Sequence, residues 1–146
     1  MGADEKVVPM GLTKGAIPAP PLSDRRSAAW WKEGPKPGSG TGKAVFTIHT
    51  YRPSLAPALG NELFQGGESQ LKPGDIFKVY GTKGEVACYE YEEAPKITLD
   101  EYEENSSLML DSSGPASATI VICWDFNKRT KNWDSRVLFQ FRGVNP

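Results

Sequence analysis

The sequence predicts a mainly β protein: a single antiparallel β-sandwich or small barrel of six to seven strands, Greek-key-like, with an extended N-terminal arm. Two observations predict this class. From residue 44 onward, short segments that alternate apolar and polar residues recur between turn-forming residues. Residues 1–43 are instead rich in proline and glycine and show no such period. We therefore expect a docking arm over 1–43 and a β domain over 44–146.

The composition of the arm divides it into three pieces. Residues 16–22 (AIPAPPL) are typical of polyproline II, because proline fixes φ and removes a backbone donor. Residues 23–33 are expected to form a short capped helix, and residues 35–43 a flexible linker. Trp30 and Trp31 fall in the expected helix. Two indoles in a segment without a core of its own need another surface to cover them.

The elements of the β domain follow from alternation and turn chemistry. The expected strands are 44–51, 76–80, 85–91, 107–111, 118–126 and 133–142. A tight turn at Gly81–Gly84 should join the second and third of these strands into a hairpin. The segment 118–126 is apolar almost throughout, which favours a central strand buried on both faces. Helical turns are expected near 58–64 and after the capping-box pair Thr98 and Glu101.

The composition also limits the function classes. A chain of 146 residues fits one domain, and a formal net charge of -1 creates no strong field toward nucleic acid or anionic lipid. No apolar run approaches the ~20 residues that a membrane helix needs. The N-terminus lacks the apolar core of a secretory signal. We therefore expect cytoplasmic synthesis without a signal peptide, followed by residence in a large complex such as a virion.

Few residues of this chain are chemically reactive. The chain has two cysteines, Cys88 and Cys123, and one histidine, His49. Both cysteines lie in apolar, strand-like segments, so we interpret them as buried thiols and leave a disulfide between them open. One histidine and no CxxC pair argue against a structural zinc site. His49 is interpreted as a half-exposed strand residue, because no nucleophile signature accompanies it.

Two further segments are similar to functional motifs but lack the required spacing. Gly38–Lys43 (GSGTGK) has the glycines of a phosphate loop, but the flanking Pro37 and Ala44 break the pattern and favour a linker. The acidic residues between Glu85 and Glu104 match no calcium-loop pattern and favour a solvated or docking face. We therefore predict no catalytic residue, no metal and no cofactor, and expect that the chain is not an enzyme.

The favoured hypothesis is a non-enzymatic structural or assembly subunit, for example a viral shell or decoration protein. Its arm would dock on neighbouring protein chains, including copies of itself; membrane insertion and nucleic-acid binding are not expected. The alternative is a carbohydrate- or other ligand-binding module with an exposed strip formed by Tyr89, Tyr91, Trp124 and Trp133. A third hypothesis is an enzyme that uses His49 or the acidic belt, by which we mean the acidic residues between Glu85 and Glu104.

The predicted partner-binding residues come from three regions. They are Pro20, Pro21, Trp30 and Trp31 of the arm, Glu92 and Glu93 of the acidic belt, and Lys128 and Arg129 of a polar loop. Tryptophan is the residue that most often dominates an interface, so the two indoles are expected to be the anchors.

Overall fold

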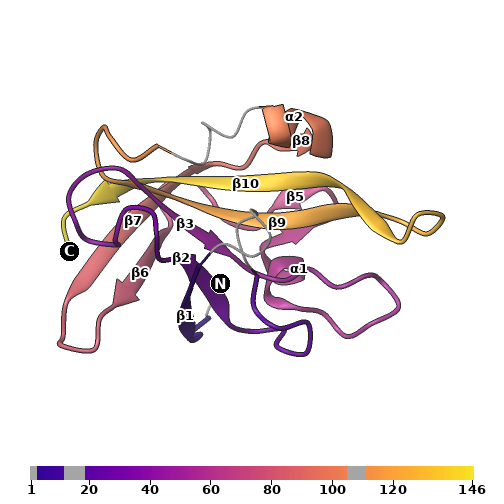
Figure 1. Ribbon diagram of the computed structural model, residues 1–146, viewed down its shortest axis with the longest axis horizontal. Coiled ribbons are helices and arrows are strands. Elements are labelled where there is room, and N and C mark those ends of the chain that lie inside the picture. Colours follow the sequence, from indigo (N-terminus) through magenta and orange to yellow (C-terminus); the bar gives the residue numbers. More distant parts are fainter. Residues whose placement is uncertain (1–2, 12–18, 105–110) are drawn as a thin grey trace.

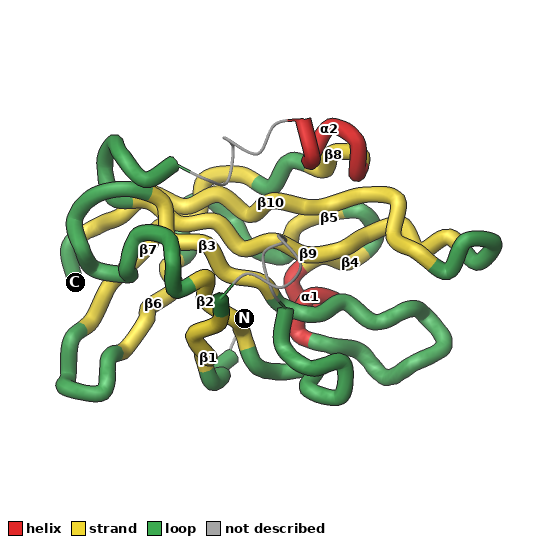
Figure 2. The backbone as a smooth tube through the Cα atoms, viewed as in Figure 1, coloured by secondary structure: helices red, strands yellow, loops and turns green. Residues whose placement is uncertain are grey.

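The main sheet of the protein is curled into a half-barrel (Figure 1). The described residues also form two short helices, which lie at the margin of this sheet. The computed structural model describes residues 3–11, 19–104 and 111–146. The strands of the main sheet are β1 (Val7–Met10), β2 (Ala28–Trp31), β3 (Lys43–Thr47), β6 (Ile76–Tyr80), β7 (Val86–Glu93), β8 (Lys96–Thr98), β9 (Ser117–Asn127) and β10 (Asn132–Val144). The other elements of the described residues are a small ribbon of β4 (Phe64–Gln65) and β5 (Glu68–Ser69) and the helices α1 (Leu59–Leu63) and α2 (Leu99–Glu104) (Figure 2).

The sheet is mixed, which corrects part of the fold prediction. Its order is β1-β2-β3-β9-β10-β7-β6. Strand β8 pairs with residues 135–137 of β10, which come before the part of β10 that pairs with β7. A mainly β protein is confirmed, but a single antiparallel sandwich is wrong, because β1 runs parallel to β2 and β3 runs parallel to β9. A parallel pair needs a long crossover, and the chain between β3 and β9 supplies one that contains every element from α1 to α2.

Most of the expected elements are present. The hairpin of β6 and β7 is confirmed, with Gly84 at a φ of 87° in its turn. Helices α1 and α2 lie where helical turns were expected, and Thr98 and Glu101 exchange the hydrogen bonds of a capping box. Of the predicted strand 107–111, residues 107–110 lie outside the described residues.

The predicted helix over 23–33 is wrong, because Ala28–Trp31 forms strand β2 between β1 and β3. In a strand, neighbouring side chains point to opposite faces. Trp30 therefore packs on one hydrophobic cluster and Trp31 on another. Both indoles are half-buried against their own chain. The division of the chain at residue 43 stays a prediction.

Two hydrophobic clusters cover the two faces of the sheet. The larger cluster fills the curl and contains aromatic residues of several strands; at its centre, Phe139 is 0% exposed. The smaller cluster, on the other face, consists of Val45, Val121 and Leu138, with Trp31 packed against it. The central strand β9 contributes to both clusters, so its predicted burial on both faces is confirmed. Figure 1 shows that β9 and β10 run side by side across the whole molecule.

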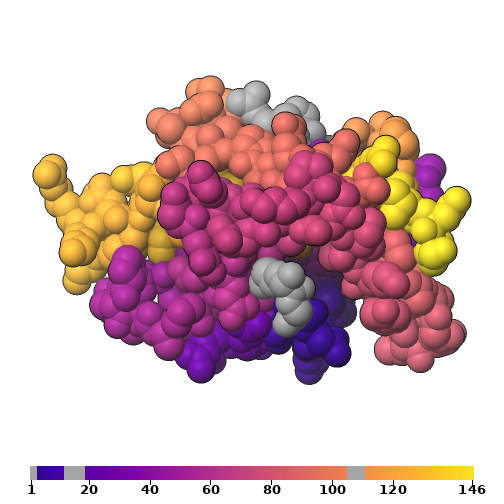
Figure 3. Space-filling view, turned by 180° about the vertical axis from the view of Figure 1, so that it is seen from behind, coloured from indigo at the N-terminus to yellow at the C-terminus, as the bar shows by residue number. Residues whose placement is uncertain are grey.

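A hollow of about 690 Å³ opens between β1 and β6, the two end strands of the sheet order. Its floor is formed by apolar residues of the larger cluster, and the segment before β1 forms one rim. Figure 3 shows the depression beside the β6–β7 hairpin. Within the described ranges, no helix has the length and apolarity to cross a membrane.

Candidate functional site

A histidine just beyond β3, a cysteine on β9 and an arginine on β10 follow one line of register across the sheet. Strands β3 and β9 pair in parallel up to Thr47 opposite Val121, and the Ile48 N–H still donates to the Val121 carbonyl at 3.4 Å. The register, continued two residues beyond the end of β3, leads from His49 to Cys123. On the other side of β9, Cys123 is the direct register partner of Arg136 on β10.

The three side chains lie on the same face of the sheet. Residues in register on adjacent strands point to one face, and the side chains of a strand alternate with a period of two. Cys123 lies two residues after Val121, and Arg136 lies two residues before Leu138, both members of the smaller cluster. Ile48 belongs to the larger cluster on the opposite face, which puts His49 on the face of Cys123.

Cys123 is a free, partly buried thiol next to a cation. No disulfide joins it to Cys88, which is also a free thiol and lies buried on β7. Burial raises the pKa of the Cys123 thiol, and the Arg136 guanidinium acts against that increase. The resting thiol is therefore protonated at neutral pH and needs a base before it can act as a nucleophile.

Arg136 is held in place from three sides. Its Nη1 donates to the carbonyl oxygens of Ser135 at 2.9 Å and Trp133 at 3.2 Å. The guanidinium carbon lies 5.8 Å from the centroid of the Tyr102 ring, so the aromatic face of α2 supports the cation. Burial raises the pKa of the Tyr102 hydroxyl, again against the influence of Arg136. This arrangement gives a fixed positive group beside the thiol.

His49 is half-buried and held by the N-terminal arm. Its Nε2 lies 2.5 Å from the carbonyl oxygen of Pro20 and 3.1 Å from that of Pro21. The ring of Tyr51 lies beside the imidazole, with centroids 6.1 Å apart. The Tyr51 hydroxyl donates to the carbonyl oxygen of Leu22. The arm segment and the end of β3 therefore form one wall of the site.

The backbone just beyond the cysteine is strained. Asp125 has a φ of 56°, which a residue with a Cβ adopts at a cost. Its Oδ2 accepts hydrogen bonds from the Ser135 hydroxyl at 2.8 Å and from the Lys96 ammonium at 2.9 Å. Lys96, and secondarily Ser135, lowers the pKa of the Asp125 carboxyl. Strain of this kind concentrates at functional sites, and here it lies two residues from Cys123.

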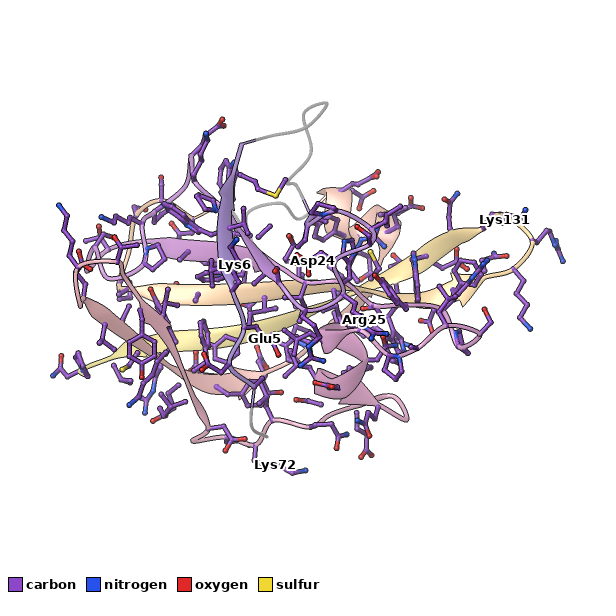
Figure 4. All side chains as sticks on the ribbon, turned by 90° about the horizontal axis from the view of Figure 1, so that it is seen from below. Glu5, Lys6, Asp24, Arg25, Lys72 and Lys131 are labelled. Atoms are coloured by element: carbon purple, nitrogen blue, oxygen red, sulfur yellow. The ribbon has the colours of Figure 1, made fainter. Side chains whose placement is uncertain are left out.

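The structure distributes the predicted partner-binding residues over distant parts of the molecule. Pro20 is buried against His49 while Pro21 is exposed, and Glu92 and Glu93 are exposed at the end of β7. Lys128 and Arg129 are exposed in the turn of the β9–β10 hairpin; Figure 4 labels Lys131 of that turn at the outer end of the molecule. Whether any of these residues binds a partner stays a prediction.

The alternative ligand platform is absent from the surface. Tyr89 and Tyr91 are 3% and 5% exposed and belong to the larger cluster, and Trp124 packs edge-on against Phe64. Trp133 is half-buried and packs edge-on against Phe126, so the four residues do not form an exposed strip. In the described part of the chain, no group of three or more His, Cys, Asp or Glu side chains has the arrangement of a metal site.

Sequence reasoning missed two of the three residues in the row. It interpreted Cys123 as a buried thiol and gave Arg136 no catalytic role, so neither was expected on a line of register with His49. The row depends on the parallel pairing of β3 with β9, which are separated by about 70 positions. No local pattern in the sequence reports that pairing.

The comparisons with known proteins assign the fold. No family model matches the chain, and no curated protein matches it. Among solved structures, the fold is that of the sortases. A lid mutant of sortase C1 from Streptococcus agalactiae has a TM-score of 0.64 at 14% identity, over 99% of this chain and 64% of that chain.

Two further class C sortases agree with this fold. Sortase C1 of Streptococcus suis has a TM-score of 0.62 at 18% identity, over 96% of this chain and 65% of that chain. Sortase C of Streptococcus pneumoniae, whose structure was used to study catalysis and pilin substrate specificity, has a TM-score of 0.60 at 19% identity, over 84% and 55%. The chain thus spans 55% to 65% of the length of these three proteins, and identities this low show the fold alone.

These findings correct the functional interpretation of the sequence. The hypothesis of a non-enzymatic structural subunit, with its capsid and virion assignments, is wrong, because the fold is one that sortase enzymes share. The prediction that the chain is not an enzyme is contradicted by the same similarity. The predicted compartment stays a prediction.

Proposed function

We propose that the chain is a cysteine-dependent transpeptidase that acts on protein substrates. The observation that carries this proposal is the row of His49, Cys123 and Arg136 on one face of a sortase-like sheet. A cysteine nucleophile needs a base within reach and a group that stabilises the oxyanion, and the row supplies all three residue types. The pilin specificity studied in the pneumococcal sortase supports a protein as the substrate class.

The first half-reaction forms a thioester. The proton of the Cys123 thiol passes to His49, and the thiolate attacks the carbonyl carbon of a peptide bond. The negative charge that develops on the carbonyl oxygen is stabilised by the Arg136 guanidinium. When the C–N bond breaks, the leaving amine takes the proton from His49, and the acyl group remains on Cys123.

The second half-reaction transfers the acyl group. A new amine attacks the thioester carbon and gives its proton to His49, and Cys123 leaves as the thiolate, which takes the proton back from His49. The product is a new amide bond, so no oxidant, reductant or nucleotide is consumed. The partly buried position of Cys123 supports transfer over hydrolysis, because a shielded thioester is less accessible to water.

The proposal is tested with a peptide library, an excess of an amine acceptor and mass-spectrometric detection of amide exchange. We expect the wild-type chain to transfer acyl groups and Cys123→Ala to lose about 10⁴-fold or more of the rate, as expected when a nucleophile is removed. Cys88→Ala is the matched control, since that thiol is buried on another strand. Equal rates for wild type and Cys123→Ala would refute the proposal.

A further inference from the structure

The only histidine of the chain is in contact with two backbone carbonyl groups of a proline pair. Both carbonyl oxygens, those of Pro20 and Pro21, lie within hydrogen-bond distance of the same ring nitrogen, His49 Nε2. A carbonyl oxygen can only accept a hydrogen bond, so Nε2 must carry a proton. A neutral imidazole carries one proton on its ring nitrogens, and Nδ1 is therefore the nitrogen that is able to accept another.

We propose that Pro20 and Pro21 are positioning residues, whose carbonyl groups orient His49 and fix its tautomer. The proton of Cys123 Sγ–H then moves to Nδ1 of neutral His49, which leaves a thiolate and an imidazolium. The other proton stays on Nε2 throughout, where the two carbonyl oxygens accept its hydrogen bonds. This inference rests on the proposed function, because it supplies the third member that a nucleophile–base pair requires.

Proline suits this task because its backbone is rigid. The pyrrolidine ring locks φ of Pro20, and the ring of Pro21 restricts Pro20 further to extended conformations. The two carbonyl groups therefore lose little conformational freedom when they align with the imidazole. Pro20 is also buried, which keeps its carbonyl oxygen away from competing water.

The segment that contains the prolines, residues 19–27, is fastened to the elements that flank His49. The Pro21 carbonyl also accepts a hydrogen bond from the Asp24 N–H at 2.8 Å, and the Arg25 carbonyl accepts one from the Leu59 N–H at 2.9 Å. The Tyr51 hydroxyl clamps the segment to the end of β3 through Leu22.

Two ion pairs of Arg26 also fix the same segment to its surroundings. The Arg26 guanidinium lies 2.6 Å from a carboxylate oxygen of Glu5 and 2.7 Å from one of Glu62 on α1. Figure 4 labels Asp24, Arg25 and Glu5 in this region, close to the middle of the long strands. The two carbonyl groups therefore belong to a segment that hydrogen bonds and ion pairs hold in place.

The test uses the full chain labelled with ¹⁵N-histidine, in which every imidazole signal belongs to His49. At a pH where the ring is neutral, we expect the spectrum of a single tautomer with the proton on Nε2. In the double variant Pro20→Gly/Pro21→Gly, we expect the two nitrogen shifts to move toward each other, as they do when tautomers mix. The rate of Cys123 alkylation should fall by about tenfold, less than the ~10²–10⁴-fold effect of a complete general base.

Two more variants keep the test decisive. Pro73→Gly/Pro115→Gly removes two exposed prolines outside this segment and should leave the tautomer unchanged. This control has the same effect of proline loss on the entropy of the unfolded chain. Tyr51→Phe removes only the hydroxyl that clamps Leu22 and should cause a smaller shift in the same direction, even if the double glycine variant does not fold.

Three results would overturn the inference. They are a wild-type tautomer protonated on Nδ1, a tautomer that is unchanged in the proline and tyrosine variants, and faster alkylation once the segment is loosened. The last result would mean that the segment blocks His49 instead of orienting it. Because the tautomer is measured without any substrate, failure of this inference and failure of the transpeptidase proposal are distinguishable.

Discussion

At the scale of single residues, each member of the proposed site is held by neighbours to which no chemical step is assigned. Arg136 is fixed by two carbonyl groups and the Tyr102 ring, and His49 by the carbonyl groups of the proline pair. Asp125 holds the backbone beyond Cys123 in its left-handed conformation through its bonds to Ser135 and Lys96. Such support lowers the reorganisation that the proposed reaction requires.

The Lys96–Asp125 pair predicts a pH-dependent contribution to stability. The pKa of Asp125 is lowered in the folded state, chiefly by Lys96, so the contribution is present above the ordinary carboxyl pKa and is lost as pH falls through the folded value. The two side chains are 46% and 44% exposed, which limits the contribution to about 1 kcal/mol or less.

Urea unfolding at two pH values measures this contribution. Asp125→Asn, which tolerates the positive φ, should be less stable than wild type at pH 7 and closer to it at about pH 2–3. Lys96→Met should show the same loss at pH 7, and the double variant should lose no more than either single variant. A constant difference between Asp125→Asn and wild type at both pH values would argue against the pair.

At the scale of elements, helix α1 determines where β3 ends and where His49 lies. The Gly60 N–H donates to the His49 carbonyl at 2.8 Å, and a Cβ on Gly60 would lie 2.6 Å from that oxygen and from the Thr50 hydroxyl. Only a residue without a side chain allows this approach. The position of the histidine thus depends on a glycine in another element.

Gly60→Ala is therefore expected to move α1 away from β3. We expect a loss of about 1–3 kcal/mol in the free energy of unfolding, from overpacking against backbone, together with slower alkylation of Cys123. In the control variant Gly11→Ala, the closest atom is a Glu33 carboxylate oxygen at 3.2 Å, at the flexible end of a side chain. If both variants unfold at the same urea concentration as wild type, the close approach does not position α1.

The elements also show how far the sequence alone could lead. Alternation and turn residues predicted β6, β7 and β10, and the nearly continuous apolar run 118–126 predicted β9, because these signals lie within each strand itself. The same rules gave a helix for Ala28–Trp31, where pairing with two neighbouring strands decides the conformation. Local propensity cannot report a partner that is distant in the chain.

At the scale of the whole molecule, the curled sheet brings together residues that no motif connects. The parallel register of β3 and β9, continued two residues beyond β3, leads from His49 to Cys123, and the β9–β10 hairpin pairs Cys123 with Arg136. His49 was noticed in the sequence, but the row was not, because it exists only after the sheet has formed. The site is therefore a property of the topology.

The central claim, that His49 activates Cys123 within this row, is tested most directly by the alkylation rates of the two cysteines of the intact chain. Peptide mapping after short exposure to iodoacetamide separates Cys123 from Cys88, and unfolding in urea provides the reference in which both thiols react alike. We predict that in the folded protein Cys123 reacts faster than Cys88 and that His49→Ala slows Cys123 selectively. The account is contradicted if folded Cys123 is no more reactive than Cys88, or if His49→Ala leaves its rate unchanged.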